Sequence, residues 1–436
     1  MREALKDLVR YWRLYLLTLV LGIGGSFQLG MQVSIMASPA EHIQSFVNQT
    51  WLGRYEVPVS DSTNMLIWSF IVSVFSLGGW VGAIHSGSLS VTYGRKKALL
   101  FNNIVALVAA VLMVFSPMAK SFEMILLGRF LYGYNAGLGW NIQLMYLGES
   151  SPKKLRGFLT ITITVFNNLG KVMGQIVGIK ELMGTDDMWP WLMALGGLPA
   201  ILQFVTLLFF PEAPRYLYID KGDTEGCKKA LHWLWQEDDV QMEMDDMGKE
   251  RASMQGQNVK TIWDVLTSRC VRWQLLVLVI PCAGVQFCGF NAIYFYAFDI
   301  FREAGVAEDK MHYLSIGIGT TDLLTITLCV STIPTLPADI FLQAWRPSAY
   351  VISGSINWLS LFLIGMFFPF IVDGLGQFCF LIFVAYCLFS AAFVLYFLPE
   401  TKGKSTVEIM EDFNKLNYKN RGTDTEKADF VMATKF

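Results

Sequence analysis

Ten long apolar segments restrict the kind of fold that this chain can adopt. They fall at residues 14–36, 64–86, 98–117, 122–146, 157–179, 189–210, 273–297, 313–341, 347–372 and 376–398. Each has about 20 residues or more, which is enough to cross the hydrocarbon core of a bilayer as a helix. Strands or loops would leave their backbone polar groups unsatisfied in hydrocarbon. The sequence therefore predicts an all-α polytopic membrane protein with about ten transmembrane helices.

The composition excludes several classes of function. Mean hydropathy is +0.43, and only 16% of the residues are charged, against about a quarter in soluble domains. No basic face stands clear of the apolar segments, so we expect no nucleic-acid partner. The four histidines, at 42, 85, 232 and 312, have no metal-ligand spacing, and phosphate-loop and nucleophile motifs are missing. We therefore expect no enzyme activity, no metal and no cofactor.

The distribution of charge predicts the orientation of the helices. With the N-terminus inside, 27 of the 34 Lys and Arg lie in cytoplasmic segments and 5 in outer loops. Such an excess of positive charge is typical of cytoplasmic loops. The single N-x-[ST] sequon, at Asn48, then falls in the first outer loop, where it is a candidate glycosylation site. We expect both termini in the cytoplasm.

An imperfect internal repeat divides the chain into two halves. An acid stands seven residues before an arginine at Glu149 and Arg156, and again at Asp339 and Arg346. A Pro-Glu pair follows an apolar segment at 211–212 and again at 399–400. Both features recur after about 190 residues, and internal repeats of this kind are usual in transporters. From its first helix to its acid, the second half is about 70 residues shorter than the first, a deficit of about two membrane helices.

The repeat predicts four regions and a network of charges. Residues 1–210 form a six-helix bundle, 211–272 a cytoplasmic linker with short helices, 273–398 a shortened bundle, and 399–436 a cytoplasmic tail. Acids and arginines at the inner ends of the helices can form ion pairs that break when the ends separate. The alternative is that the positive charges only set the topology. The predicted inner-face network comprises Arg95, Glu149, Arg156, Glu212, Arg215, Asp339, Arg346 and Glu400.

Seven motifs along the chain form a specific set. They are GRK after the second apolar segment, GRFLYGYNAG, MYLGESSPKKLRG, FFPEAPRYL, QFCGFNAIYFYA, SGSINWLS and LPETKGK. Together they resemble the facilitative hexose transporter family of the major facilitator superfamily. FQLGMQVSIMASPAEHIQSFVNQTW and the NNI after GRKKALLF resemble its fructose-transporting branch. The resemblance implies two six-helix bundles with the sugar between them. Near 331–333 this chain skips the ninth helix and most of the tenth, which leaves about four helices in the second bundle.

The resemblance also implies which residues bind the sugar. A sugar needs neutral hydrogen-bonding groups for its hydroxyls and an aromatic face for its C–H surface. The matching residues are Gln286, Asn291, Tyr296, Asn357 and Trp358, with Thr164 at the position of a family glutamine. Buried amides in membrane helices also serve only to join helices. Lys171 lies within a span with no obvious partner, which leaves an anionic substrate such as urate open as a variant.

Two functions fit these features. The first is facilitative uniport of hexose, fructose or glucose, by alternating access, since the first span lacks the carboxylate that proton-coupled relatives carry. The second is a non-transporting variant that acts through a full-length partner, because the second bundle is short. A channel would need a ring of charges or carbonyls that the sequence does not suggest. We expect a sugar substrate and a lipid bilayer, in the plasma membrane, as its surroundings, and the oligomeric state is open.

Overall fold

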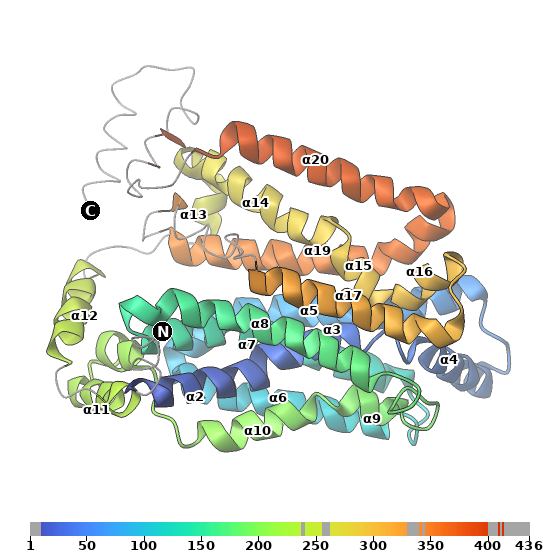
Figure 1. Cartoon of the computed structure of the whole chain (residues 1–436), viewed down its shortest axis with the longest axis horizontal. Helices are drawn as coiled ribbons and strands as arrows, with labels where there is room; N and C mark the ends of the chain where they lie inside the picture. The colour runs from blue at the N-terminus through green and yellow to red at the C-terminus, as the bar shows by residue number, and fades with distance from the viewer. Residues whose placement is uncertain are drawn as a thin grey trace.

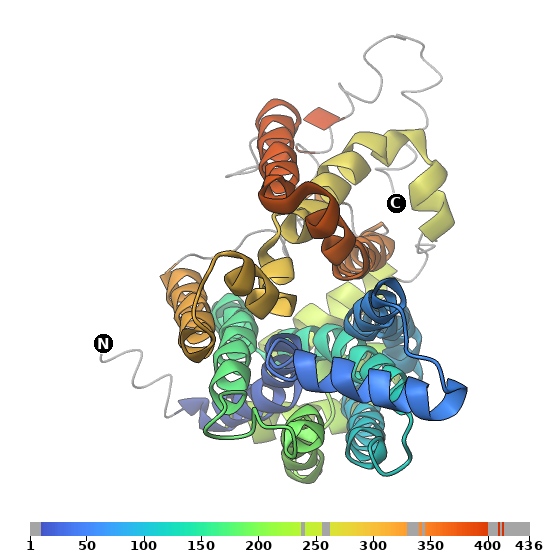
Figure 2. The ribbon, with the colours of Figure 1, turned by 90° about the vertical axis from the view of Figure 1, so that its right-hand side faces the viewer.

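The computed structural model describes residues 10–236, 240–254, 262–328, 340–341, 345–399, 409 and 412–413. Within these residues the chain consists of helices and connecting loops, without a strand. Long helices run side by side, and three short ones gather at one end (Figure 1): α11 (Thr224–Trp235), α12 (Gln241–Met254) and α13 (Ile262–Thr267). We call this end the linker face. The opposite end is the α4 face, where α4 (Ala40–Tyr55) lies across the ends of other helices (Figure 2).

In the described part of the first half, six helical segments of membrane length pack together. They are α2 (Trp12–Leu21), which continues through a π-helical turn at Gly22–Phe27 into α3 (Gln28–Ser34), then α5 (Asp61–Tyr93), α6 (Arg95–Phe115), α7 (Phe122–Ser150), α8 (Lys153–Val177), and α9 (Trp189–Ala194) with α10 (Gly197–Leu207). α7 packs against α5 and α6, and α8 against α3. Gly133 and Gly137 let α7 approach the backbone of α5 so closely that any Cβ there would overlap it. Small residues at such crossings are typical of membrane helices.

The second half is smaller. Its described helices are α14 (Arg272–Phe287), α15 (Phe290–Phe295), α16 (Ala297–Glu303), α17 (Glu308–Leu328), α19 (Arg346–Leu375) and α20 (Cys379–Phe397). Gly289, at φ +83°, separates α14 from α15, and glycine adopts this left-handed conformation without steric cost. α14 packs against α19 and α20, whereas α17 packs mainly against α8 of the first half. The second half is therefore joined to the first through α17 as well as through α19.

Seven helical stretches within the described residues are long and apolar enough to cross a membrane: Trp12–Ser34, Asp61–Tyr93, Arg95–Phe115, Trp189–Leu207, Arg269–Phe295, Ser348–Leu375 and Cys379–Phe397. The predicted segments 122–146, 157–179 and 313–341 correspond to α7, α8 and α17. These helices run alongside the others (Figure 1) and contain more polar residues. The prediction of an all-α polytopic membrane protein is confirmed.

α17 and α20 are the least covered helices of the second half. On α20, the side chains of Leu381, Leu388 and Leu395 are 61%, 67% and 83% exposed. On α17, three threonines are exposed, and each hydroxyl donates to the carbonyl four residues earlier: Thr320, Thr321 and Thr325. A hydroxyl satisfied in this way by its own helix needs no partner on another helix. The predicted join near 331–333 lies outside the described residues, as does all of the tail except residues 399, 409 and 412–413.

Candidate functional site

Three amides of the second half form one hydrogen-bonded cluster. Gln286 Nε2 donates to Asn357 Oδ1 over 2.7 Å, and Asn291 Nδ2 donates to Gln286 Oε1 over 2.5 Å. The break at Gly289 brings this about, because it ends α14 just after Gln286 and turns Asn291 back toward it. Gln286 is 4% exposed, while the other two are half-buried. The cluster offers neutral donors and acceptors, the groups that exchange with sugar hydroxyls.

Trp358 lies beside this cluster in sequence and bridges the two halves. Its side chain is 7% exposed and meets Phe75 of α5 edge to face, with ring centroids 6.0 Å apart. The indole covers Gly79 of α5 so closely that a Cβ on Gly79 would overlap the ring. Trp358 therefore provides an aromatic wall at the contact of the two halves.

The contacts of Tyr296 and of Thr164 differ from those of the three amides. The Tyr296 hydroxyl donates to the carbonyl of Gly365 over 2.5 Å and so joins the α15–α16 junction to α19. Thr164 lies on α8, where its carbonyl accepts a hydrogen bond from Asn168. Among the described residues, no hydrogen bond connects the Thr164 side chain with the other five predicted sugar-site residues. The structure thus joins three of the six predicted residues, Gln286, Asn291 and Asn357, by hydrogen bonds. Trp358 contacts α5 and Tyr296 contacts α19, while Thr164 lies on α8.

The two halves touch over the part of their interface nearer the α4 face. α5 and α19 meet at Gly79 and Trp358, and again at Ser73, which faces Gly365 and Met366. At the α4 face itself, Arg302 of α16 pairs with Glu41 of α4. Toward the linker face the same helices have exposed residues: Tyr93 on α5 is 59% exposed and Tyr350 on α19 is 46% exposed. These contacts between α5 and α19 thus lie in the part of the interface nearer the α4 face.

A buried ion pair joins α8 to α17 at the same interface. Lys171 Nζ lies 3.3 Å from Asp322 Oδ2, with side chains 8% and 10% exposed. The hydroxyl of Tyr294 donates to the same carboxylate oxygen, and the ammonium lies 4.7 Å from the rings of both Phe290 and Tyr294. The expectation that Lys171 has no partner is wrong. A buried lysine within a span indicates in the sequence that an acidic partner exists, but Asp322 is one of two acids within the predicted segment 313–341.

Arg129 is a second cation inside the membrane region. It is fully buried, donates to the backbone and side-chain oxygens of Gln32 over 3.1 and 3.4 Å, and stacks 4.5 Å above the Phe75 ring. Its Nε and Nη2 atoms have no hydrogen-bond partner within the described chain. Within the described chain, the polar side chain of the first span that contacts Arg129 is that of Gln32, an amide rather than a carboxylate.

At the linker face, Arg95 forms the centre of the charge network. Its guanidinium donates to Glu149 over 2.7 and 3.1 Å and to Asp220 over 2.9 Å, and it lies 4.8 Å above the ring of Tyr216. The pairing with Glu149 was part of the predicted network. Asp220 was missed because it lies in the linker without a repeated counterpart.

Glu212 contributes through the backbone of α6. Its Oε1 atom accepts the N–H groups of Arg95 and Lys96, both over 2.9 Å, at the first turn of this helix. A carboxylate there satisfies donors that have no partner within the helix and interacts favourably with the helix dipole. Gly94, at φ +94°, allows the approach, since a Cβ would collide with the carboxylate.

The remaining predicted network residues lie around this centre or beyond the described chain. Arg215 pairs with Glu243 of α12 over 3.2 Å and also acts electrostatically on Glu149. Arg156 donates to the carbonyl of Ser151 over 3.4 Å. Asp339, Glu400 and the side chain of Arg346 lie outside the described residues.

The predicted glycosylation acceptor lies at the opposite end of the molecule. Asn48 is exposed on α4, at the α4 face. Exposure is what such a modification requires.

Comparisons with known proteins agree with this architecture. The family described as Sugar (and other) transporter matches residues 17–333 and 323–413, two stretches that meet where the second half is predicted to be shortened. Human solute carrier family 2, facilitated glucose transporter member 11 is 39% identical, over 96% of each protein. Mouse facilitated glucose transporter member 5 is 37% identical, over 93% of this chain and 92% of that protein.

Solved structures show the fold. The proton:xylose symporter XylE bound to 6-bromo-6-deoxy-D-glucose has a TM-score of 0.73 at 18% identity, over 92% of this chain and 99% of that chain. An inward open conformation of the xylose transporter XylE from E. coli also has a TM-score of 0.73 at 18% identity, over 91% of this chain and 99% of that chain. This chain therefore has the major facilitator fold and belongs to the sugar transporter family, among the facilitative transporters of solute carrier family 2, which are not enzymes.

Proposed function

We propose that this chain carries a hexose, fructose or glucose, across the bilayer by uniport. The observation that supports this most directly is the amide cluster of Gln286, Asn291 and Asn357, with Trp358 beside it at the contact of the two halves. Neutral amides exchange hydrogen bonds with water and with sugar hydroxyls at similar cost, and an indole covers the C–H face of a pyranose or furanose ring.

Alternating access follows from how the halves touch. In the proposed cycle, residues 1–210 and 273–398 rock against each other, and the contact of Trp358 on α19 with Phe75 and Gly79 of α5 closes the path on the side nearer the α4 face. The Arg95 centre, whose side chains from α6, α7 and the linker pair in this structure, holds the helix ends of the first half together at the linker face. We propose that the linker face, with both termini, is cytoplasmic and that the chain lies in the plasma membrane, in keeping with its excess of positive charge.

Two features support uniport of a neutral sugar. Gln32 beside Arg129 is an amide, which has no proton to exchange at physiological pH. Asp322 neutralises Lys171, so this pair attracts no anion, which disfavours urate as the substrate. A proton symporter would need a carboxylate that titrates during the cycle.

The test is uptake of labelled fructose and glucose into liposomes that contain only this chain, correctly inserted, with and without a proton gradient. We expect saturable uptake that Trp358→Ala abolishes and that the gradient does not change. Trp191→Ala is the matched control, because Trp191 is 56% exposed on α9, away from the amide cluster. Uptake that survives Trp358→Ala would contradict the proposed site, and uptake driven by the gradient would contradict uniport.

A non-transporting variant is the second candidate. The break between the two family matches and the poor cover of α17 and α20 favour it. Such a chain would act through a full-length partner. In the same liposomes it would give no uptake although correctly inserted, and it would co-purify with a full-length transporter when both are expressed together.

A further inference from the structure

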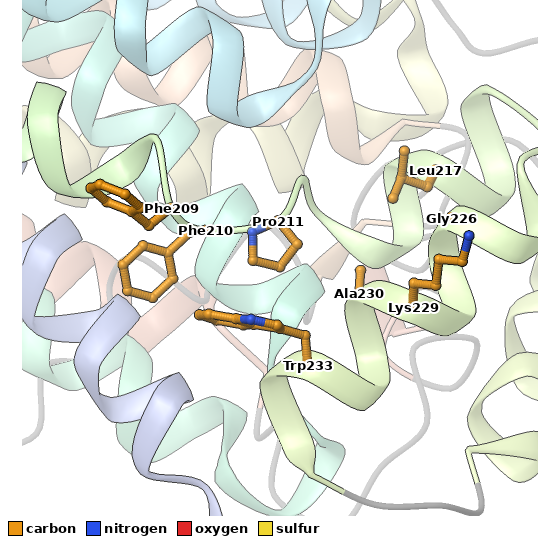
Figure 3. Close-up of a pocket in the computed structure, with 8 residues that line it drawn as sticks. All are labelled: Phe209, Phe210, Pro211, Leu217, Gly226, Lys229, Ala230 and Trp233. Atoms are coloured by element: carbon orange, nitrogen blue, oxygen red, sulfur yellow. The ribbon is translucent and has the colours of Figure 1, made fainter.

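A groove at the linker face lies between the end of α10 and the linker helix α11, away from the sugar site (Figure 3). It has a volume of about 300 Å³. Its walls are formed by Phe209, Phe210, Pro211, Leu217, Gly226, Lys229, Ala230 and Trp233. None of these residues belongs to the amide cluster or to the Arg95 centre, so neither of those sites accounts for the groove.

One end of the groove is aromatic and continuous with the outer surface of α10. Phe209 is 76% exposed, and Phe210 meets Trp233 edge to face, with centroids 5.3 Å apart. The stripe of exposed apolar side chains that leads up to this end comprises Leu198, Ile201, Leu202, Val205 and Leu208. An acyl chain lying along α10 therefore reaches the groove without leaving an apolar surface.

The other end of the groove is cationic. Lys229 is the one charged residue of the lining, and no acid lines the groove. Lys229 is exposed and makes no ion pair or hydrogen bond with the described part of the chain. In Figure 3 its amino group points away from the aromatic end, toward the side of Leu217. The groove thus has the polarity of a phospholipid, with apolar walls at one end and a free ammonium at the other.

The indole of Trp233 is held in place from outside the groove. Arg13 of α2 lies 4.9 Å from the Trp233 ring and donates to its carbonyl over 3.1 Å. Trp233 belongs to the linker helix α11 and is held against the start of the membrane helix α2, and a tryptophan at this level, with a lysine beyond it, is typical of the boundary between hydrocarbon and headgroups. This placement favours a lipid over a water-soluble peptide as the occupant.

We propose that this groove binds one anionic phospholipid. Its acyl chain lies against Phe209, Phe210 and Trp233, and its phosphate or headgroup charge lies at Lys229. Bound there, the lipid joins α11 to α10 and stabilises the packing of the linker on the first half. The inference does not depend on whether the chain transports sugar. Phosphatidylserine is the probe, because anionic lipids of this kind are found in the cytoplasmic leaflet.

The experiment titrates phosphatidylserine or phosphatidylcholine onto the purified full-length chain in detergent and counts bound lipid by native mass spectrometry. Lys229→Gln should lower the affinity for phosphatidylserine about fivefold and leave phosphatidylcholine unchanged, as expected for one lysine near a headgroup. Lys228→Gln is the matched control, since Lys228 is exposed on the same helix but does not line the groove.

A second pair of variants tests the apolar end. Phe209→Ala should weaken the binding of both lipids, whereas Phe101→Ala, which removes an exposed phenylalanine of α6 outside both the lining and the α10 stripe, should weaken neither. All four side chains are exposed, so equal melting temperatures without added lipid should show that each variant folds. The proposal is overturned if the wild type binds phosphatidylserine no better than phosphatidylcholine. Equal losses in Lys228→Gln and Lys229→Gln, or no loss in Lys229→Gln, would overturn it too.

Discussion

Removing one member of the Lys171–Asp322 pair should destabilise the protein far more than removing both. The two charged atoms are 3.3 Å apart, with side chains 8% and 10% exposed. At an effective dielectric constant of about 20, two unit charges at this distance attract each other by about 5 kcal/mol. Burial costs each charge several kcal/mol of hydration. The intact pair therefore contributes little net free energy, although it joins the two halves.

The single variants leave a buried charge without its partner. Lys171→Met leaves Asp322 with the Tyr294 hydroxyl, and Asp322→Asn leaves Lys171 with the rings of Phe290 and Tyr294. We expect each single change to cost about 3–5 kcal/mol of stability. The double variant should be about as stable as the wild type, or more stable by up to about 4 kcal/mol, because no buried charge is then left without a partner.

The assay is the midpoint of unfolding of the purified full-length chain in detergent, followed by intrinsic fluorescence for the wild type, both single variants and the double variant. The control is the neutral hydrogen bond of the same interface, from Gln175 to Ser315 over 2.9 Å. Its removal by Ser315→Ala should cost about 1 kcal/mol. A double variant as unstable as the sum of the two single variants would refute the reasoning, because the two charges would then act independently.

Three further predictions concern other parts of the molecule. Gly79→Val should push the Trp358 ring away, lower stability by about 1–3 kcal/mol and be rescued in a melting assay by Trp358→Ala, since the indole is what the new side chain meets. Glu149→Gln should lower the free energy of unfolding by about 1.5–3 kcal/mol, because Arg95 loses its charged acceptor. The melting temperature should fall accordingly, and an unchanged melting temperature would contradict this. Burial raises the pKa of the Cys227 thiol to about 11. Its alkylation, measured by peptide mass spectrometry, should therefore be slow at pH 8, where about one thiol in a thousand is ionised, and should accelerate up to about pH 11 while the protein stays folded.

Much of the fold was predictable because the bilayer restricts the choices. A segment of about 20 apolar residues has to be a helix there, and this argument places the described membrane helices near their predicted segments. α7 and α8 were found in this way although they contain more polar residues, since their length and flanking loops still identify them. The predicted short linker helices are present as α11, α12 and α13.

The candidate site was predictable in part. Gln286 and Asn291 are five residues apart, and the sequence motif places both near Trp358, but their hydrogen bond depends on the helix break at Gly289. Asp220 and Asp322 were not assigned as partners of Arg95 and Lys171, because each contact joins residues more than a hundred positions apart. Lysine or arginine in a span indicates that a partner exists without indicating which acid it is.

The sequence by itself determined that this chain is a helical membrane protein and which motifs relate it to sugar transporters, while its division into two unequal halves stays a prediction. Those properties follow from hydrophobicity, periodicity and local spacing, which each segment has independently of the others. Only the tertiary structure decided that Lys171 is neutralised, that α17 packs on the first half, and that α5 and α19 meet nearer the α4 face. These properties depend on which helix faces lie together, and side-chain packing and buried charge pairing act only once the helices have met.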